Sequence, residues 1–150
     1  MSGSGTAILL VEDDDNDVLL IRRAFTQAGL HHPIQVVRDG DAAVAYLSGD
    51  GRYADRSAYP MPGLMLLDLK LPRRTGLEVL AWARREDALR RLPIVVLTSS
   101  RELADVNRAY ELGANSYLVK PVEFAQLLDM VRVFDGYWSG LNELPEIGAV

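Results

Sequence analysis

Five short apolar runs recur along the chain, and they constrain its fold more than any other feature of the sequence. Each run is four or five residues long, an ordinary length for a strand. Most of the runs are continuously apolar, a pattern typical of parallel strands that helices cover on both faces. The five predicted strands are Ala7–Val11, Ile34–Val37, Leu64–Leu67, Ile94–Leu97 and Ser116–Val119.

Segments with a helical spacing of apolar residues follow each predicted strand. The first helix is expected to begin after an N-cap at Asp14 or Asp15 and to stop at Gly29. Strand and helix alternate five times, which predicts an α/β fold, a doubly wound (βα)5 sandwich with a five-stranded parallel sheet. The other helices are expected over Ala42–Leu47, from Leu77 after Gly76, over Glu102–Leu112 with Gly113 as the stop, and from Glu123 onward.

The remaining segments are expected to form a long surface loop and a tail. The loop, Ser48–Gly63, is rich in Gly and Pro and holds Tyr53 and Tyr59. We expect one domain over residues 1–136, in which residues 1–5 are a flexible N-terminus, and a C-terminal extension over residues 137–150 that serves as an interface arm. Doubly wound sheets bind ligands at the carboxyl ends of their strands, so functional residues are expected directly after the strands.

The composition excludes several classes of protein. The chain has 150 residues and no cysteine, which excludes thiolate catalysis, cysteine-ligated zinc and iron–sulfur clusters. Its net charge of −5 argues against binding to a nucleic-acid backbone. The longest apolar runs are too short to span a bilayer, and the N-terminal segment lacks the features of a signal peptide. We therefore expect a cytoplasmic protein with neither a nucleic-acid nor a membrane partner.

The first predicted strand runs into an acidic segment with five carboxylates in six residues. Carboxylates this close repel one another, so they need a cation, a helix N-terminus or solvent to compensate. Glu12 and Asp13 directly follow a buried strand, where a hard divalent cation is the natural partner. Helix capping and solvation account for the later three, Asp14, Asp15 and Asp17.

Polar residues also follow three other predicted strands. Asp68 follows the third strand, Thr98 begins a Thr-Ser-Ser segment after the fourth, and Lys120 precedes Pro121 after the fifth. Each of these alone is most often a turn residue or a surface charge. Together with the acidic pair they place carboxylates, a hydroxyl and an amine at one edge of one sheet. This set suits phosphoryl transfer to a carboxylate nucleophile beside Mg²⁺.

From about Thr6 to Val133 the chain resembles the receiver domains of response regulators in two-component signalling. The resemblance implies a flavodoxin-like fold with strand order 2-1-3-4-5 and a phosphoacceptor at Asp68, within Leu-Leu-Asp-Leu-Lys-Leu-Pro. It implies a Mg²⁺ site formed by Glu12, Asp13, Asp68 and the backbone carbonyl of Lys70.

The same resemblance implies roles for the residues after the fourth and fifth strands. Thr98 and Lys120 would bind the phosphoryl group. Thr98 and Tyr117 would form a switch, in which Thr98 moves toward the new anion and Tyr117 turns inward behind it. The Lys120–Pro121 peptide bond would be cis, as the family usually has it.

The long loop, the segment Ala109–Tyr117 and the tail are similar to those of stand-alone regulators paired with bacterial phytochrome kinases. A sensor histidine kinase, of the bacteriophytochrome type, is therefore the implied partner. It is expected to dock on the first helix, around Asp17 to Ala28. The tail departs from the family pattern at Gly140.

Three other functions fit the sequence less well. A Mg²⁺-dependent phosphohydrolase with an aspartate nucleophile needs a second Asp two residues after the first, where this chain has Lys70. An EF-hand beginning at Asp13 needs Gly and Glu where the chain has Val18 and Ala24. A DNA-binding output domain would need about 60 further residues after the fifth helix. His31 and His32 are interpreted as surface residues in a turn, not as phosphate carriers or metal ligands.

The last helix and the tail carry more apolar residues than one buried stripe can use. A stripe of Phe124, Leu127, Leu128 and Val131 suffices for an amphipathic helix. The surplus predicts a two-fold homodimer on the fourth helix, fifth strand and fifth helix, extended by the tail. The alternative is a tail that folds back and covers this surface within one chain. The predicted interface residues are Met130, Phe134, Tyr137, Trp138 and Leu141.

Overall fold

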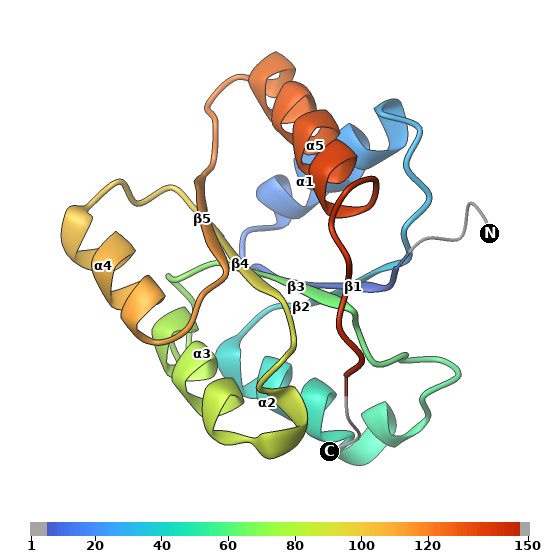
Figure 1. Cartoon of the computed structure of the whole chain (residues 1–150), viewed down its shortest axis with the longest axis vertical. Helices are drawn as coiled ribbons and strands as arrows, with labels where there is room; N and C mark the ends of the chain where they lie inside the picture. The colour runs from blue at the N-terminus through green and yellow to red at the C-terminus, as the bar shows by residue number, and fades with distance from the viewer. Residues whose placement is uncertain (1–5, 148–150) are drawn as a thin grey trace.

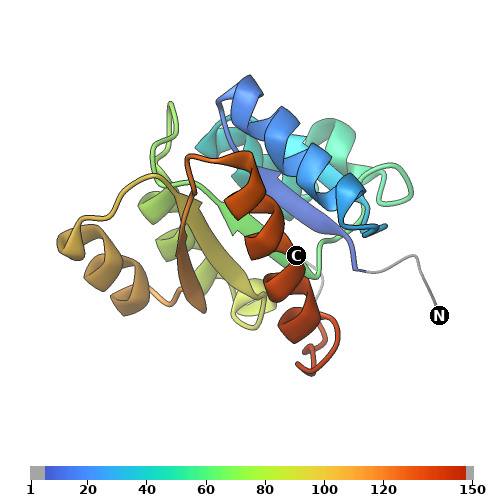
Figure 2. The same cartoon turned by 90° about the horizontal axis from the view of Figure 1, so that it is seen from above.

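The computed structural model describes residues 6–147, which form a parallel sheet between two layers of helices (Figures 1 and 2). The strands lie in the order β2-β1-β3-β4-β5, and every neighbouring pair is parallel, which confirms the predicted fold class and strand order. The strands are β1 (Ile8–Val11), β2 (Ile34–Val37), β3 (Leu64–Leu67), β4 (Ile94–Thr98) and β5 (Ser116–Val119). Residues 1–5, expected to be a flexible N-terminus, and the last three residues of the expected tail lie outside the described residues.

The helices begin and end close to the predicted positions. Asp14 caps α1, its side chain accepting hydrogen bonds from the backbone N–H groups of Asn16 and Asp17. Gly29 follows the end of α1 with a φ of 74°, a left-handed conformation that favours glycine. The helices are α1 (Asp15–Gln27), α2 (Gly40–Ser48), α3 (Gly76–Arg85), α4 (Leu103–Glu111) and α5 (Phe124–Trp138), with short 3₁₀ helices η1 (Gly51–Ala54) and η2 (Asp87–Leu89).

Two cores form because successive side chains of each strand point to opposite faces of the sheet. On β1, Ile8 and Leu10 pack with α1 and α5, whereas Leu9 and Val11 pack with α2 and α3. All four side chains are buried. The continuously apolar runs therefore reflect strands buried on both faces, as predicted.

The segment Ser48–Gly63 is only partly the surface loop that we predicted. It contains η1, and Tyr53 in it is buried. The rings of Tyr46, Tyr53 and Tyr59 pack against one another, with centroids 5.0 to 6.1 Å apart. Three aromatic rings bury enough apolar surface to hold a long connection against the domain, and loop composition does not reveal such packing.

The prediction that His32 is merely a surface residue is wrong. Its side chain is largely buried, with 11% exposure, and its Nε2 lies 2.7 Å from Asp135 Oδ1 on α5. Its Nδ1 accepts a hydrogen bond from the backbone N–H of Thr6. His32 therefore links the start of β1 to the end of α5, whereas His31 is exposed as predicted.

The described part of the tail folds back within the chain. After α5 ends at Trp138, the chain turns and runs past the start of β1 toward α2 and η1 (Figure 1). Ile147 packs against the core on the α2 and α3 face of the sheet. The described tail therefore lies along its own chain, but Tyr137 and Leu141 stay exposed, so it does not cover the whole apolar surface expected at an interface.

Candidate functional site

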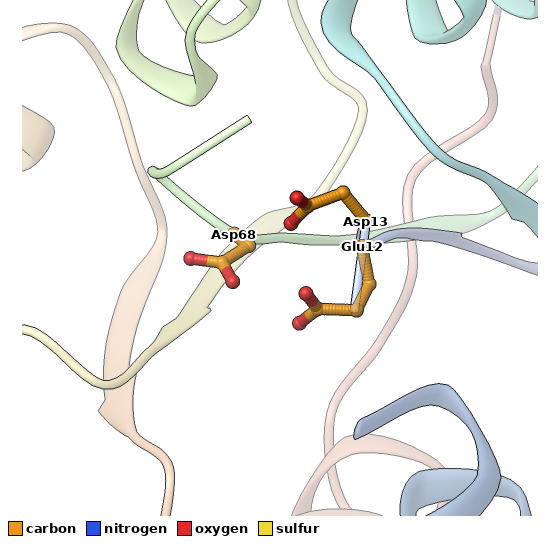
Figure 3. Close-up of side chains that lie close together, drawn as sticks. All are labelled: Glu12, Asp13 and Asp68. Atoms are coloured by element: carbon orange, nitrogen blue, oxygen red, sulfur yellow. The ribbon is translucent and has the colours of Figure 1, made fainter. Parts of the chain in front are cut away.

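An acidic site forms where β1 and β3 end (Figure 3). Glu12 and Asp13 follow β1, and Asp68 follows β3, so parallel pairing of the two strands brings the three carboxylates to the same edge of the sheet. One oxygen from each carboxylate lies within 4.8 Å of the others. Glu12 and Asp68 are buried, and Asp13 is exposed. A cluster of carboxylate oxygens with one side open to solvent suits Mg²⁺, which prefers oxygen ligands and keeps several waters.

Lys120 compensates the charge of this cluster from the end of β5. Its Nζ donates hydrogen bonds to Asp68 Oδ2 at 2.8 Å, to Asp17 Oδ2 at 2.9 Å and to Glu12 Oε1. The contact of Asp17 with Lys120 was not predicted, because capping and solvation account for Asp17 in the sequence. Its position in the first turn of α1, directly after β1, is the sequence signal that places it beside the sheet edge.

The pKa values in the site show how burial and charge pairing oppose each other. Burial raises the pKa of Glu12 to about 7, against the lowering effect of Lys120. Burial also acts to raise the pKa of Asp68, but hydrogen bonding from Lys120 and the nearby Thr98 hydroxyl bring it below its usual value. The pKa of Lys120 is raised because its three carboxylate partners outweigh its burial. Asp68 is therefore the more acidic carboxylate of the buried pair.

The Thr98 hydroxyl is the unpaired polar group of the site. Thr98 ends β4 and is fully buried, and its Oγ1 has no hydrogen-bond partner among the residues that the structure describes. The hydroxyl lies close enough to Asp68 to lower the pKa of that carboxyl, although the two groups do not meet the geometry of a hydrogen bond. A buried hydroxyl without a partner carries a desolvation cost. It is therefore ready to donate to an anion placed on Asp68.

The backbone around Asp68 is held closely by α3. A Cβ atom on Gly76 would lie 2.1 Å from the carbonyl oxygen of Asp68, so only glycine allows α3 to begin this close to the site. The backbone N–H of Lys70 also donates to Asp68 Oδ1 at 3.3 Å. The side chain of Lys70 is exposed. The metal ligand predicted at this position is the backbone carbonyl, so that role does not depend on the charged side chain.

The other predicted switch residue, Tyr117, is half-buried on β5. Its hydroxyl donates to the carbonyl oxygen of Ser100 at 3.0 Å. The Lys120–Pro121 peptide bond is trans, so the cis bond implied by the family resemblance is a wrong prediction for this structure. The trans form is the intrinsic preference of X-Pro bonds by about 0.5–1 kcal/mol.

The predicted dimer residues lie on α5 and the tail, and they divide into two groups. Met130, Phe134 and Trp138 pack against the chain's own core between the sheet, α1 and α5. Tyr137 is 56% exposed and Leu141 is 78% exposed. Within residues 6–147 no helix is both long enough and apolar enough to cross a membrane.

Known proteins that are similar to this chain include regulatory proteins of archaea and bacteria. The chain is 43% identical to the probable methanogenesis regulatory protein FilR2 of Methanothrix harundinacea, over 92% of this chain and 86% of that protein. It is 40% identical to the response regulator Rcp1 of Synechocystis sp., over 92% of each. Both relatives match along nearly their whole length.

The solved structures that are similar to this chain include response regulators as well. The phosphorylated cyanobacterial phytochrome response regulator RcpA matches with a TM-score of 0.86 and 38% identity, over 94% of this chain and 99% of that one. The bacteriophytochrome response regulator RtBRR matches with a TM-score of 0.74 and 46% identity, over 93% of this chain and 84% of that one. A Mn²⁺-bound form of Rcp1 matches with a TM-score of 0.84 and 39% identity, over 95% of this chain and 100% of that one.

The family assignment rests on the site and on a match along most of the sequence. The carboxylates, the hydroxyl and the lysine lie together at one edge of the sheet, as the family resemblance implies. The family model described as the response regulator receiver domain matches residues 8–132. The chain therefore belongs to the response regulator receiver domain family.

Proposed function

We propose that Asp68 accepts a phosphoryl group from the phosphohistidine of a sensor histidine kinase and that this changes the chain's contacts with other proteins. The observation that carries this proposal is the pairing of a buried, ionised Asp68 with Lys120, beside a buried Thr98 hydroxyl that lacks a partner. An Asp68 oxygen attacks phosphorus, the P–O bond forms, and the P–N bond to the kinase histidine breaks.

The chain's own groups stabilise the charge that builds on the transferred phosphoryl. Lys120 already lies 2.8 Å from Asp68 Oδ2 and can pair with a phosphoryl oxygen. Thr98 can donate its free O–H to another oxygen. Bound Mg²⁺ would neutralise the remaining charge, and Glu12, Asp13, Asp68 and the Lys70 carbonyl would hold it. Glu12 has the longer side chain and would act through a water molecule.

We also propose that the chain is a phosphoacceptor and not an enzyme, with slow self-dephosphorylation at most. Hydrolysis of an acyl phosphate is accelerated when an acid or base lies near the attacking water. Two residues after Asp68 the chain has the exposed Lys70 in place of an acid. The phosphoryl group would therefore persist long enough to act as a signal.

If Asp13 is a metal ligand, the Asp13→Asn variant should bind Mg²⁺ much more weakly than the wild type. Removing one of three clustered charges should weaken Mg²⁺ binding about tenfold or more. Asp15→Asn is the matched control, because Asp15 is exposed and pairs with Arg38 outside the cluster. Calorimetric titration with Mg²⁺ measures both affinities. Equal affinities for the two variants would contradict the assignment of Asp13 as a ligand.

The proposed partner is a histidine kinase of the phytochrome type, docked on α1. Helix α1 begins beside the acidic site and exposes Leu19, with 63% exposure, so the helix offers an apolar contact to a partner. Relatives described as phytochrome response regulators support the sensor type. We expect faster transfer from phytochrome-type kinases than from unrelated ones, and slower transfer to Leu19→Arg than to Leu141→Arg. Transfer only from kinases with unrelated sensors would reject this pairing.

We propose a receiver domain over residues 1–136, with residues 137–150 as an extension that contributes to a homodimer. Val133, Tyr137 and Leu141 recur every four residues and are 74%, 56% and 78% exposed, which leaves one apolar stripe for a partner. A second copy would meet this stripe on the face of α4, β5 and α5.

Sedimentation velocity tests the dimer. At concentrations of about tens of micromolar, where weak regulatory interfaces associate, the wild type should sediment as a dimer. A Tyr137→Ala, Leu141→Ala double variant should sediment as a monomer, because both side chains lie outside the chain's own core. Leu19→Ala, an exposed change on α1, should remain dimeric. A monomeric wild type at these concentrations would exclude the dimer.

A further inference from the structure

Three hydrogen bonds meet at Ser100, in the loop between β4 and α4. Ser100 Oγ donates to Asp105 Oδ2 at 2.6 Å, and the backbone N–H of Glu102 donates to Ser100 Oγ at 3.3 Å. The Tyr117 hydroxyl donates to the Ser100 carbonyl oxygen. Ser100 is buried, with 7% exposure. The loop is therefore tied to α4 through one side chain and to β5 through its backbone.

These contacts fix the backbone next to the Thr98 hydroxyl. Ser100 lies two residues after Thr98, and on the other side the Thr98 carbonyl accepts a hydrogen bond from the backbone N–H of Lys120 at 2.8 Å. Thr98 is thus anchored on both sides, with its free hydroxyl near Asp68. Tyr117 is half-buried, and its hydroxyl bonds to the loop backbone at Ser100. The loop is therefore held from β5 as well as from α4.

Helix α4 has little else to hold its first turn. Within Leu103–Glu111, Ala109 is the one buried residue, and Leu103 at the start is 70% exposed. The N-cap residue, Glu102, makes no side-chain capping hydrogen bond. The hydrogen bond from Ser100 to Asp105 therefore ties this turn to the β4–α4 loop where no capping side chain does. An element with so few buried contacts can change position at a small cost in free energy.

We propose that the hydrogen bond from Ser100 to Asp105 is a clamp that presets the β4–α4 loop for the phosphoryl group, so that Ser100 and Asp105 are positioning residues of the switch. The proposal rests on the proposed function of Asp68. A ligand that binds one loop conformation has an apparent dissociation constant that rises as the population of that conformation falls. Loss of the clamp should therefore weaken binding of a phosphoryl mimic without changing any group that touches it.

The test uses Mg²⁺ and beryllofluoride as the mimic, with the Thr98 amide and Tyr117 ring resonances followed by NMR. Ser100→Ala and Asp105→Ala should bind beryllofluoride about fivefold or more weakly than the wild type, as the preset population falls. Their Tyr117 ring resonances should shift before any beryllofluoride is added. A structural role confined to α4 would leave both the affinity and the Tyr117 ring unchanged.

Two further variants separate the clamp from simple charge effects at the start of α4. Asp105→Asn keeps an oxygen that can accept from Ser100 and should retain affinity within about twofold of the wild type. Glu102→Ala removes a neighbouring negative charge that caps nothing and should do the same. Wild-type affinity in Ser100→Ala, or an Asp105→Asn variant as weak as Asp105→Ala, would overturn the clamp. A wild type that does not bind beryllofluoride with Mg²⁺ would overturn the proposed function itself.

Discussion

A Lys120→Met variant is expected to lose about 3–5 kcal/mol of unfolding free energy at pH 8, because it removes the cation from a buried cluster. Glu12 and Asp68 are almost fully buried, and both carboxylates bond to Lys120 Nζ. Without that amine, two negative charges would face each other away from solvent. Methionine keeps most of the volume and the apolar stem of lysine, so the loss reports the charge.

The loss of unfolding free energy in the Lys120→Met variant should grow as the pH rises. In the variant, burial without Lys120 holds the pKa values of Glu12 and Asp68 above their unfolded values. Groups with raised pKa values contribute stability below the unfolded pKa, and this is lost as the pH rises through the folded pKa. In the wild type the pKa of Asp68 is lowered, so its contribution is present above the unfolded pKa and is lost as the pH falls. In the wild type the pKa of Glu12 is also raised, to about 7, so this group loses stability with rising pH there too. Without Lys120 both carboxylates do so, and the difference in unfolding free energy between variant and wild type is therefore smaller near pH 4 and larger toward pH 8.

Lys70→Met is the matched control, since Lys70 is the other lysine of the chain and its side chain is exposed. Urea unfolding of both variants at pH 4, 6 and 8 gives the comparison. The Lys70→Met variant should stay within about 0.5 kcal/mol of the wild type throughout. A Lys120→Met variant as stable as the Lys70→Met variant at pH 8 would show that the cluster does not need its cation.

The strands and the site could be predicted from sequence because both depend on short local patterns. A strand buried on both faces appears as a continuous apolar run, and β2, β3 and β5 have the predicted bounds. Parallel pairing then determines that residues after β1, β3, β4 and β5 share one edge. Glu12, Asp68, Thr98 and Lys120 could therefore be placed together before their distances were known.

The features that sequence did not reveal depend on contacts between distant segments. His32 contacts Asp135, which is 103 residues away, and no local pattern distinguishes it from the exposed His31 beside it. The Asp17 contact with Lys120 spans the same separation. Ser100 follows a strand in a segment typical of turns, and only the position of α4 brings Asp105 to it. The course of the tail likewise depends on the core surface that Ile147 reaches.

An Asp68→Asn variant should lose phosphoryl uptake by about three orders of magnitude or more, because an amide is a poor nucleophile. The variant should stay folded, since Lys120 keeps Glu12 and Asp17 as partners. Transfer of ³²P from an autophosphorylated kinase, with Mg²⁺ present and then removed by a chelator, measures the loss. Asp87→Asn, an exposed change in η2, should accept label at the wild-type rate. Uptake by Asp68→Asn at that rate would remove Asp68 from its role.

The most direct measurement identifies the side chain that carries the phosphoryl group. Borohydride reduces an acyl phosphate to an alcohol, so a phosphorylated aspartate becomes homoserine and can be found by mass spectrometry. Trypsin releases the peptide 57–70, in which Asp68 is the sole acidic residue. We predict homoserine at position 68 after kinase treatment with Mg²⁺, and an unchanged peptide when the chelator is present. Homoserine at Asp13 or another carboxylate, with peptide 57–70 unmodified, would contradict phosphoryl acceptance by Asp68.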